Sequence, residues 1–513
     1  MPSREARVLQ APGWLVGLAA ATALVVLCAY LRVVPDLAAS AEDHTWERVF
    51  HRLSRAGLSG VFTNTAGTYR PLCGSFLLAE DALGLSYAAK HWISALMYFG
   101  NSCLLGALMA RLCGVRMGVL TALVATTWLS ADEVLVWLGG RCDLLWVSFA
   151  LIGSHFALTV LRAARVPALP LVLATIMCAA ACLTKEPGFV LPLLWLTYAV
   201  YVRSEWRRMW SAVAISIVCL AWRTWVSAGL GPYIANYVSN GPLSWAAQGT
   251  QALGTLSLGT GPDAGPLMYL LGAIATLGAL GLVLQRCQTR ARVAMIGVLG
   301  LLLGPCALLF ASRTLYPAVL VLAGMISVVC CSGEPPRRFV LAAFLVWQMG
   351  SATVGLASWQ RGYVDRRASI AALARISGAG ERLLLLAPRG LYAGRPLGVI
   401  ADADVFEGRA IGTACRAREQ AASTRSLSWH APRLRLDTSA SPTHRARVTS
   451  AGACRVEVAP LGMSCAGAGG SSWAHEVRHA DGSSSIGIDA SAAPLVLVYT
   501  DLEGELRTLR CPR

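Results

Sequence analysis

Six short polar motifs interrupt an otherwise apolar sequence of 513 residues, and each contains at least one acidic or basic side chain. Carboxylates alone would be typical of a cation pathway, but these motifs contain both signs. A mixture of signs favours a site in which a carboxylate takes the proton from a hydroxyl group while cations stabilise a departing phosphate. The motifs are Glu42-Asp43, Tyr69-Arg70-Pro71-Leu72, Asp132-Glu133, Gly140-Arg141-Cys142-Asp143, Thr184-Lys185-Glu186-Pro187-Gly188 and Arg313-Thr314-Leu315-Tyr316-Pro317.

The composition indicates that these motifs belong to a membrane protein. Hydrophobic residues make up 55% of the chain, charged residues make up 14%, and the mean hydropathy is +0.55. Because a soluble domain carries roughly 25% charged residues, this composition excludes an ordinary soluble enzyme, a disordered chain and a nucleic-acid-binding domain. We therefore expect a polytopic membrane protein whose first partner is the lipid bilayer, with no nucleic-acid partner.

Eleven apolar runs predict transmembrane helices. The first run is longer than the roughly 7–15 apolar residues of a signal peptide, so we expect it to be retained as a helix. The runs are 12–34, 91–110, 117–138, 142–161, 167–183, 188–202, 210–228, 266–285, 293–311, 314–331 and 339–357.

The charges predict which side of the membrane each loop faces. If the N-terminus is cytoplasmic, the inner loops hold 14 basic residues and three acids, whereas the outer side holds ten basic residues and eleven acids up to residue 358. This asymmetry satisfies the positive-inside rule. The Arg-rich, Lys-poor composition indicates a GC-rich bacterial genome. We therefore expect an integral protein of the bacterial plasma (inner) membrane, with the six motifs near its outer face.

The sequence divides into a membrane domain, 1–358, and an extracytoplasmic C-terminal domain, 359–513. Two long outer loops, 35–90 and 229–266, each contain apolar residues at helical spacing, which predicts amphipathic helices at the membrane surface. Short apolar runs at 383–386, 398–400 and 495–499 predict strands of a small α/β domain. The four cysteines of this domain allow up to two disulfides in three alternative pairings; they are Cys415, Cys454, Cys465 and Cys511.

In their order and spacing, the motifs resemble those of the GT-C superfamily of polyprenyl-phosphate-dependent membrane glycosyltransferases. The likeness is strongest to the transmembrane O-mannosyltransferases that carry TPR repeats and to their bacterial relatives. It covers about residues 12–331 and includes His91 in front of the second predicted helix. The sequence departs from these relatives in two places: the first-loop pair is Glu-Asp, where Asp-Asp or Asp-Glu is more usual, and no TPR array follows.

The resemblance implies an all-α polytopic bundle of about eleven transmembrane helices with an active site at its outer face. It implies a donor sugar on a polyprenyl (dolichyl-like) phosphate and an acceptor hydroxyl on a protein, lipid or glycan. Such enzymes are generally inverting and need no metal. The sixteen cysteines contain no pair at zinc-binding spacing, so we expect no metal and no other cofactor.

Asp43 is the first candidate for the catalytic base, with Glu42 as its partner or substitute, although an acid just before a helix is also typical of an N-cap. Lys185, one of two lysines among 44 basic residues, is the strongest candidate for binding the donor phosphate. Each further candidate could bind substrate or form a local salt bridge or helix cap. These candidates are Arg70, His91, Asp132, Glu133, Arg141, Asp143, Glu186, Arg313 and Tyr316. For Arg70 and Arg141, the local partner would be Asp132 or Asp143.

Two other functions compete with this prediction. A lipid or solute transporter or flippase would have broken helices, midplane charges and related halves. The sequence shows no clear internal repeat, and its charges lie at helix ends. A membrane scaffold would act through its outer domain, where we find no ligand signature. Together with the resemblance, the residues therefore predict an inverting membrane glycosyltransferase that transfers a hexose from a polyprenyl phosphate.

Overall fold

The structure is a computed structural model, and it describes most of the chain up to residue 376 and nine strand segments after it. The described residues are 11–38, 49–63, 69–130, 132–201, 204–227, 241–258, 266–285, 312–332, 335–376, 382–386, 423–427, 434–437, 447–450, 454–459, 474–478, 484–489, 495–500 and 506–511. The chain forms two compact units. The first comprises 1–39 and 46–360, and the second comprises 40–45 and 361–513.

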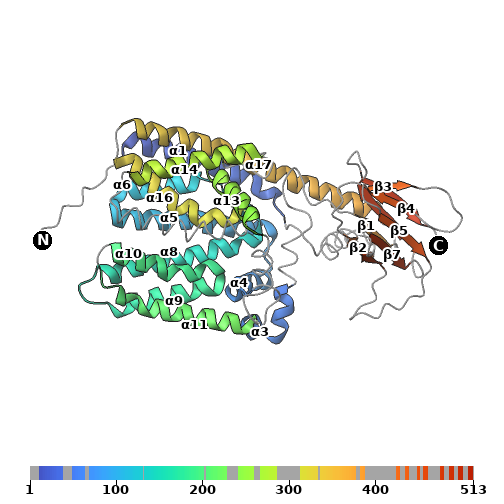
Figure 1. The fold of residues 1–513 in the computed structure, drawn as a ribbon, viewed down its shortest axis with the longest axis horizontal. Coiled ribbons are helices and arrows are strands. Elements are labelled where there is room, and N and C mark those ends of the chain that lie inside the picture. The colour runs from blue at the N-terminus through green and yellow to red at the C-terminus, as the bar shows by residue number, and fades with distance from the viewer. Residues whose placement is uncertain are drawn as a thin grey trace. The chain divides into compact units, whose positions relative to one another are not determined.

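Long helices that run side by side build the first unit (Figure 1). They are α1 (Gly13–Val33), α5 (Tyr87–Cys113), α6 (Val115–Thr127), α8 (Arg141–Arg162), α9 (Ala168–Thr184), α10 (Leu191–Tyr201), α11 (Trp210–Val226), α13 (Gly241–Leu258), α14 (Pro266–Gln285), α16 (Tyr316–Ser332) and α17 (Pro335–Ile376), which continues into the second unit. Three short helices connect them: α3 (Leu58–Thr63), α4 (Pro71–Ala82) and α7 (Glu133–Val136). Single 3-10 turns lie at Val34–Asp36, Ser54–Ala56, Leu138–Gly140, Glu186–Val190, Trp206–Met209 and Ser312–Leu315.

Apolar helices lie where the sequence predicted spans. Among the described residues, five are long and apolar enough to cross a membrane: Gly13–Asp36, Tyr87–Cys113, Leu138–Arg162, Trp206–Val226 and Arg337–Ala368. Five more are apolar but shorter: Val115–Thr127, Ala168–Thr184, Glu186–Val200, Pro266–Gly278 and Tyr316–Cys331. The predicted run 293–311 lies outside the described residues, so the number of eleven crossings stays a prediction.

One predicted span, 117–138, is not a continuous helix. α6 ends at Thr127, the backbone of Trp128 leaves the helical region, and α7 begins only at Glu133. The Trp128 indole donates to the carbonyl of Leu256 in α13 at 3.0 Å. This bond to another helix holds the chain where α6 stops. The sequence gives no warning of the break, because neither Gly nor Pro stands at this point.

Apolar side chains cover the outside of the helical unit. At least half of the surface of each of several large apolar residues is exposed: Leu24, Leu96, Ile176, Ile217 and Val218. Water would disfavour so many exposed apolar groups, whereas lipid tails solvate them. Helices also satisfy their own backbone hydrogen bonds, as the bilayer core requires. The helical unit is therefore an integral membrane domain.

Two glycines allow α5 and α6 to cross closely. A Cβ atom on Gly106 would lie 2.7 Å from the carbonyl oxygen of Gly118, and a Cβ atom on Gly118 would lie 2.4 Å from that of Gly106. Small residues at such crossings let helix backbones approach within a membrane. The tight connection between the helices uses Gly114, whose φ of 103° is strained for other residues.

Arginines stabilise helix ends at the face predicted to be cytoplasmic. Arg162 donates to the carbonyl of Arg111 near the end of α5 at 3.0 Å, and Arg208 donates to the carbonyl of Ala163 just after α8 at 2.5 Å. The last carbonyls of a helix have no partner within it, and cations there also favour the helix dipole. These arginines therefore stabilise the helix ends at that face of the bundle.

The described strands of the second unit form three sheets. β2 (Ser423–Leu427), β1 (Arg382–Leu386), β8 (Leu495–Thr500) and β9 (Leu506–Cys511) form one, in that order, with only the β8–β9 pair antiparallel. β3 (Leu434–Asp437) pairs with β4 (Arg447–Ser450), and β7 (Ser484–Asp489) lies between β5 (Cys454–Ala459) and β6 (Ala474–Arg478). Two predicted strands coincide with β1 and β8, while 398–400 lies outside the described residues. The α/β class of this domain stays a prediction.

The Gly106–Gly118 crossing predicts a position-specific loss of stability. Gly106→Leu should lower the free energy of unfolding by about 1–3 kcal/mol or more, because the new side chain collides with the α6 backbone. Gly100→Leu, in the same helix with no atom within 4 Å of a new Cβ, should have little effect. Thermal unfolding in detergent, followed by tryptophan fluorescence, measures both. Equal losses in the two variants would contradict the close crossing.

Candidate functional site

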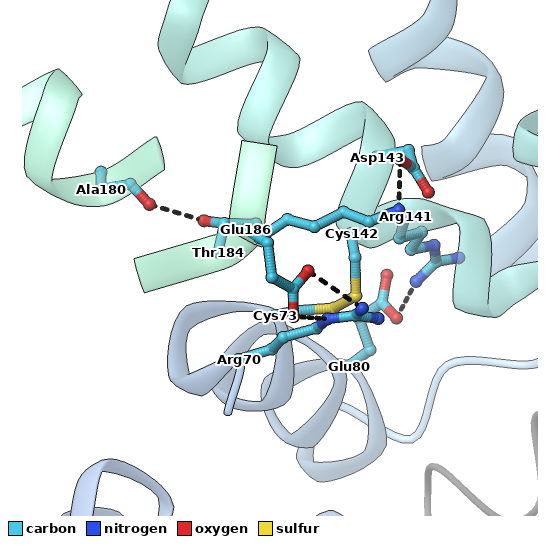
Figure 2. Close-up of a disulfide and its surroundings, with 10 residues drawn as sticks. Arg70, Cys73, Glu80, Arg141, Cys142, Asp143, Ala180, Thr184 and Glu186 are labelled. Carbon is cyan, nitrogen blue, oxygen red and sulfur yellow. Dashed lines mark hydrogen bonds and ion pairs between the residues drawn. A yellow bond between two sulfur atoms is a disulfide. The ribbon is translucent and has the colours of Figure 1, made fainter. Parts of the chain in front are cut away.

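The structure brings several predicted site residues together at one end of the helix bundle. Lys185 follows the end of α9, and its ammonium group pairs with the carboxylate of Asp143 in the first turn of α8. Both side chains are more than nine-tenths buried. Glu186, the next residue, pairs instead with Arg70 (Figure 2). Four of the predicted residues therefore form two neighbouring ion pairs.

The local sequence explains why Lys185 and Glu186 point to different partners. The backbone of Lys185 is extended, with φ −158° and ψ 153°, and consecutive side chains of an extended chain point in opposite directions. Pro187 prevents α9 from continuing. Gly188 then packs against α9, where a Cβ atom would lie 2.3 Å from the Ala181 carbonyl. The Lys-Glu-Pro-Gly motif thus ends α9 and directs the side chains of Lys185 and Glu186 to different partners.

Glu186 lies between two arginines. Arg70 Nη2 is 3.1 Å from Glu186 Oε2, and Arg223 Nη2, from the last turn of α11, is 2.8 Å from Oε1. The Glu186 side chain is 30% exposed, more than those of Arg70 at 14% and Arg223 at 10%. Among the described residues, two cations thus flank one carboxylate at a place that solvent reaches.

This environment makes Glu186 a weak base. Burial raises the pKa of its carboxyl group, but Arg70, Arg223 and Lys185 lower it more, so that the pKa lies at about 2. The group is therefore ionised at neutral pH and takes up a proton only in strong acid. Glu186 can orient cations or accept hydrogen bonds from hydroxyl groups, but a proton-accepting role at neutral pH does not fit it.

Arg141 joins three helices. Its Nε donates to Ser94 Oγ of α5 at 3.0 Å, one terminal nitrogen pairs with Glu80 of α4, and the other donates to the carbonyl of Lys90 in α5. Its side chain is 1% exposed. Each of its nitrogens is thus already engaged with protein. The local partners expected from the sequence, Asp132 or Asp143, are not the ones that the structure gives to Arg141 or Arg70.

The sequence analysis missed four charged residues at this end of the bundle. Glu80 pairs with Arg141, Lys90 pairs with Asp81, and Arg223 pairs with Glu186. Burial raises the pKa of Glu80, and Arg141 offsets only part of that rise. Arg223 carried a usable signal, because it is a basic residue at the outer end of the predicted span 210–228. Glu80 and Asp81 are adjacent acids of the first predicted outer loop, but they belong to none of the six polar motifs.

A disulfide lies among these ion pairs. Cys73 of α4 is bonded to Cys142 of α8, with 5.4 Å between their Cα atoms and a sequence separation of 69. Cys142 stands between Arg141 and Asp143, so three consecutive residues of α8 bind α4 or the end of α9. The sequence predicted disulfides only among the four cysteines of the C-terminal domain, so this pair was not expected.

The other predicted site residues take no part in these two ion pairs, or they lie outside the described residues. Asp132 accepts from Trp359 Nε1 at 3.0 Å, and Glu133, the first residue of α7, is buried. His91 Nε2 lies 3.2 Å from the Ala38 carbonyl oxygen. Tyr316 is fully buried and stacks on Tyr98. Arg313 belongs to the turn Ser312–Leu315. Glu42 and Asp43 lie outside the described residues, so the choice of base stays a prediction.

No three His, Cys, Asp or Glu side chains among the described residues are placed to hold a metal ion. The expectation of a metal-independent reaction rests on the sequence resemblance and stays a prediction. What the described geometry offers is cationic: Arg70, Arg223 and Lys185 lie around Glu186 and Asp143.

Comparisons with known proteins give matches among solved structures. No protein-family model and no curated protein matches the chain. The chain is similar to ArnT from Cupriavidus metallidurans, solved bound to undecaprenyl phosphate, with 20% sequence identity, a TM-score of 0.35, and coverage of 80% of this chain and 90% of that chain. For the apo state of the same protein, the identity is 20%, the TM-score is 0.34, and the coverage is 80% and 89%.

The buried Lys185–Asp143 pair predicts a characteristic pattern of stability. Asp143→Leu should lower the free energy of unfolding by about 3–5 kcal/mol, because it removes the carboxylate beside a buried ammonium group. The double variant Lys185→Met with Asp143→Leu should recover much of that loss. Urea or thermal unfolding in detergent measures both.

The control is Glu205→Gln, which removes an ion pair with Arg208 in which the Glu205 side chain is 75% exposed. It should change the free energy of unfolding by less than about 1 kcal/mol. A double variant that is less stable than Asp143→Leu would show that the two groups do not compensate each other.

Proposed function

We propose that the chain is a membrane glycosyltransferase that transfers a sugar from a polyprenyl phosphate to a hydroxyl acceptor. The observation that carries this proposal is the cationic cluster at the end of the bundle, where Arg70 and Arg223 flank the half-buried Glu186. Lys185 lies beside them, in a membrane domain whose outer surface is apolar. A lipid-linked phosphate combines the two matching features, an anion and an apolar chain.

In this proposal, Arg70 and Arg223 bind the phosphate of the donor. Arginine offers a planar pair of donors to phosphate oxygens, whereas lysine acts as a point charge. Before substrate binds, Glu186 neutralises part of the charge of these arginines. As the bond between sugar and phosphate breaks, negative charge develops on the phosphate. Cations already fixed by the protein stabilise that charge without reorganising. Lys185, next to the cluster in sequence, adds to the positive potential.

The base comes from the first outer loop in this proposal. Asp43, or Glu42 in its place, takes the proton from the acceptor hydroxyl, which attacks the anomeric carbon of the sugar from the face opposite the phosphate. The new glycosidic bond forms as the bond to phosphate breaks, so the configuration inverts. The low pKa of Glu186 supports the assignment by removing a competing base in the cluster.

The disulfide supports the proposed orientation of the site. Disulfides persist in oxidising compartments such as the bacterial periplasm and are rare in the cytosol. Cys73 and Cys142 lie at the same end of the bundle as the cationic cluster. We therefore place this end outside the plasma membrane of a bacterium and the arginine-capped end in the cytoplasm, with the N-terminus cytoplasmic and the C-terminal domain extracytoplasmic.

Purified protein in nanodiscs should consume polyprenyl-phosphate sugars, and variants should separate the proposed roles. Asp43→Asn or Glu42→Gln, whichever removes the base, should lower kcat by about 10²–10⁴-fold. Arg223→Met and Lys185→Met should lower kcat/KM by about 10²–10³-fold, as expected when a group that stabilises developing charge is removed. Loss of the lipid-linked sugar and release of polyprenyl phosphate are followed by mass spectrometry.

The control is Arg116→Gln, an exposed arginine at the opposite end of the bundle, which should keep wild-type turnover. Folding of each variant is checked by thermal unfolding. If folded wild-type protein consumes none of a panel of lipid-linked sugars, the proposal fails. If it instead moves a labelled lipid across a vesicle bilayer, the transporter or flippase function replaces it.

A further inference from the structure

The short outer helix α4 is attached to α8 at two points (Figure 2). Cys73 is bonded to Cys142, and Glu80 is paired with Arg141, the residue just before Cys142. Cys73, Leu77 and Glu80 follow the spacing i, i+4 and i+7, so they share one face of α4. One face of a two-turn segment is therefore fixed covalently at one end and by an ion pair at the other.

We propose that Glu80 is a positioning residue of the site, acting with the Cys73–Cys142 disulfide to hold Arg70 against Glu186. This inference rests on the proposed function, in which Arg70 binds the donor phosphate. Glu80 does not touch substrate in this account. It acts through α4, whose N-cap residue is Arg70.

The Glu80 attachment fixes the C-terminal turn of α4. Glu80 is 3% exposed and Arg141 is fully buried. Arg141 also bonds to Ser94 and to the carbonyl of Lys90, both in α5. Glu80 therefore fixes the position of α4 relative to both α5 and α8. Its second oxygen, Oε1, is buried and has no hydrogen-bond partner among the described residues, so the hold on this turn depends on the bond to Arg141.

The disulfide fixes the N-terminal turn, where Arg70 lies. Arg70 stands three residues before Cys73, and its guanidinium reaches Glu186 with Nε at 3.4 Å and Nη2 at 3.1 Å. These contacts connect α4 with the end of α9, 116 residues further along the chain. A shift of the first turn of α4 would break them. Because Cys73 is one turn away, its bond to Cys142 restrains this movement directly.

Among the described residues, the apolar cluster that packs around α4 is small. It consists of Phe50, Val61, Leu77 and the two bonded cysteines, with Leu53, Phe62 and Leu78 packed against it. Gly74 lets the Phe50 ring lie against the helix, since a Cβ atom there would lie 2.4 Å from that ring. Small cores need covalent or ionic attachments to stay ordered. The disulfide and the ion pair therefore both hold α4 in position, and either one alone partly compensates for loss of the other.

The shared task predicts strong coupling between the two attachments. The test compares wild type, Glu80→Gln, the disulfide-free variant Cys73→Ser/Cys142→Ser and the triple variant. Hydrogen–deuterium exchange of residues 71–82 needs no substrate and reports the order of α4. Either change alone should raise exchange moderately. The triple variant should exceed the product of the two effects by about tenfold, which corresponds to 1.4 kcal/mol of coupling.

Kinetics test the link to Arg70. In the triple variant, KM for the lipid-linked sugar should rise more than kcat falls, because the phosphate contact is lost from bound substrate and transition state alike. In an Arg70→Met background, the same three changes should have little further effect on KM. Glu80→Asp, which restores the charge, should recover part of the KM of wild type. A purely structural role for Glu80 would affect KM equally with or without Arg70.

If the triple variant does not fold, the disulfide of folded protein can be reduced instead, in wild type and in Glu80→Gln. Dithiothreitol should raise exchange of 71–82 far more in Glu80→Gln than in wild type, while Cys28→Ser and Cys103→Ser, which remove exposed free cysteines, should leave that response unchanged. The inference is wrong if residues 71–82 of the triple variant exchange hydrogen at the wild-type rate, or if the effects of the two changes on that rate simply multiply.

The protein could also show the coupled exchange but consume no lipid-linked sugar. That result would support the anchoring of α4 and contradict only the proposed function.

Discussion

The cost of burying charge in a medium of low dielectric constant determines how the outer end of this bundle is built. An isolated buried ion is costly, and removing one partner of a buried pair destabilises a protein strongly. The described pairs satisfy this constraint across distant parts of the chain: 42 residues separate Lys185 from Asp143, 61 separate Arg141 from Glu80, and 116 separate Arg70 from Glu186. Lipid tails are as apolar as a leucine core, so apolar contact alone specifies helix partners poorly in a membrane. The ion pairs therefore help to select which helix ends meet.

The cost of burying charge also distinguishes charged side chains that only hold helices together from those that a ligand can reach. Arg141 is fully buried and engaged with three groups, so it joins helices. The cluster of Arg70, Glu186 and Arg223 differs, because its carboxylate is 30% exposed and two described arginines flank it. Because solvent reaches this cluster, an anion can approach it, whereas the fully buried Arg141 only joins helices.

Sequence reasoning located most of the described helices, but not the ion pairs that join their ends. Apolar runs carry the helices, so most of their positions were predictable; the stop at Trp128 was not, since it depends on a bond to Leu256 in a distant helix. Arg141 and Asp143 are two residues apart in a helix and point to different sides of it, which is why their expected pairing is wrong. The true partner of Arg141, Glu80, belongs to no recognisable motif. Arg223 lies within an apolar span, where the search for motifs did not reach.

The cysteines show how one residue type takes two roles according to its position. Cys178, Cys182 and Cys219 lie in the buried apolar cluster between α9 and α11, where each packs as a small hydrophobic residue. Cys73 and Cys142 lie instead at a helix end, in a small outer core that includes few large apolar side chains. A bond between them stabilises that core only where thiols are oxidised. The basic residues gathered in the loops at the opposite end of the bundle independently predict that this end lies outside. Thiol chemistry and charge asymmetry are unrelated properties, and both are consistent with the proposed orientation.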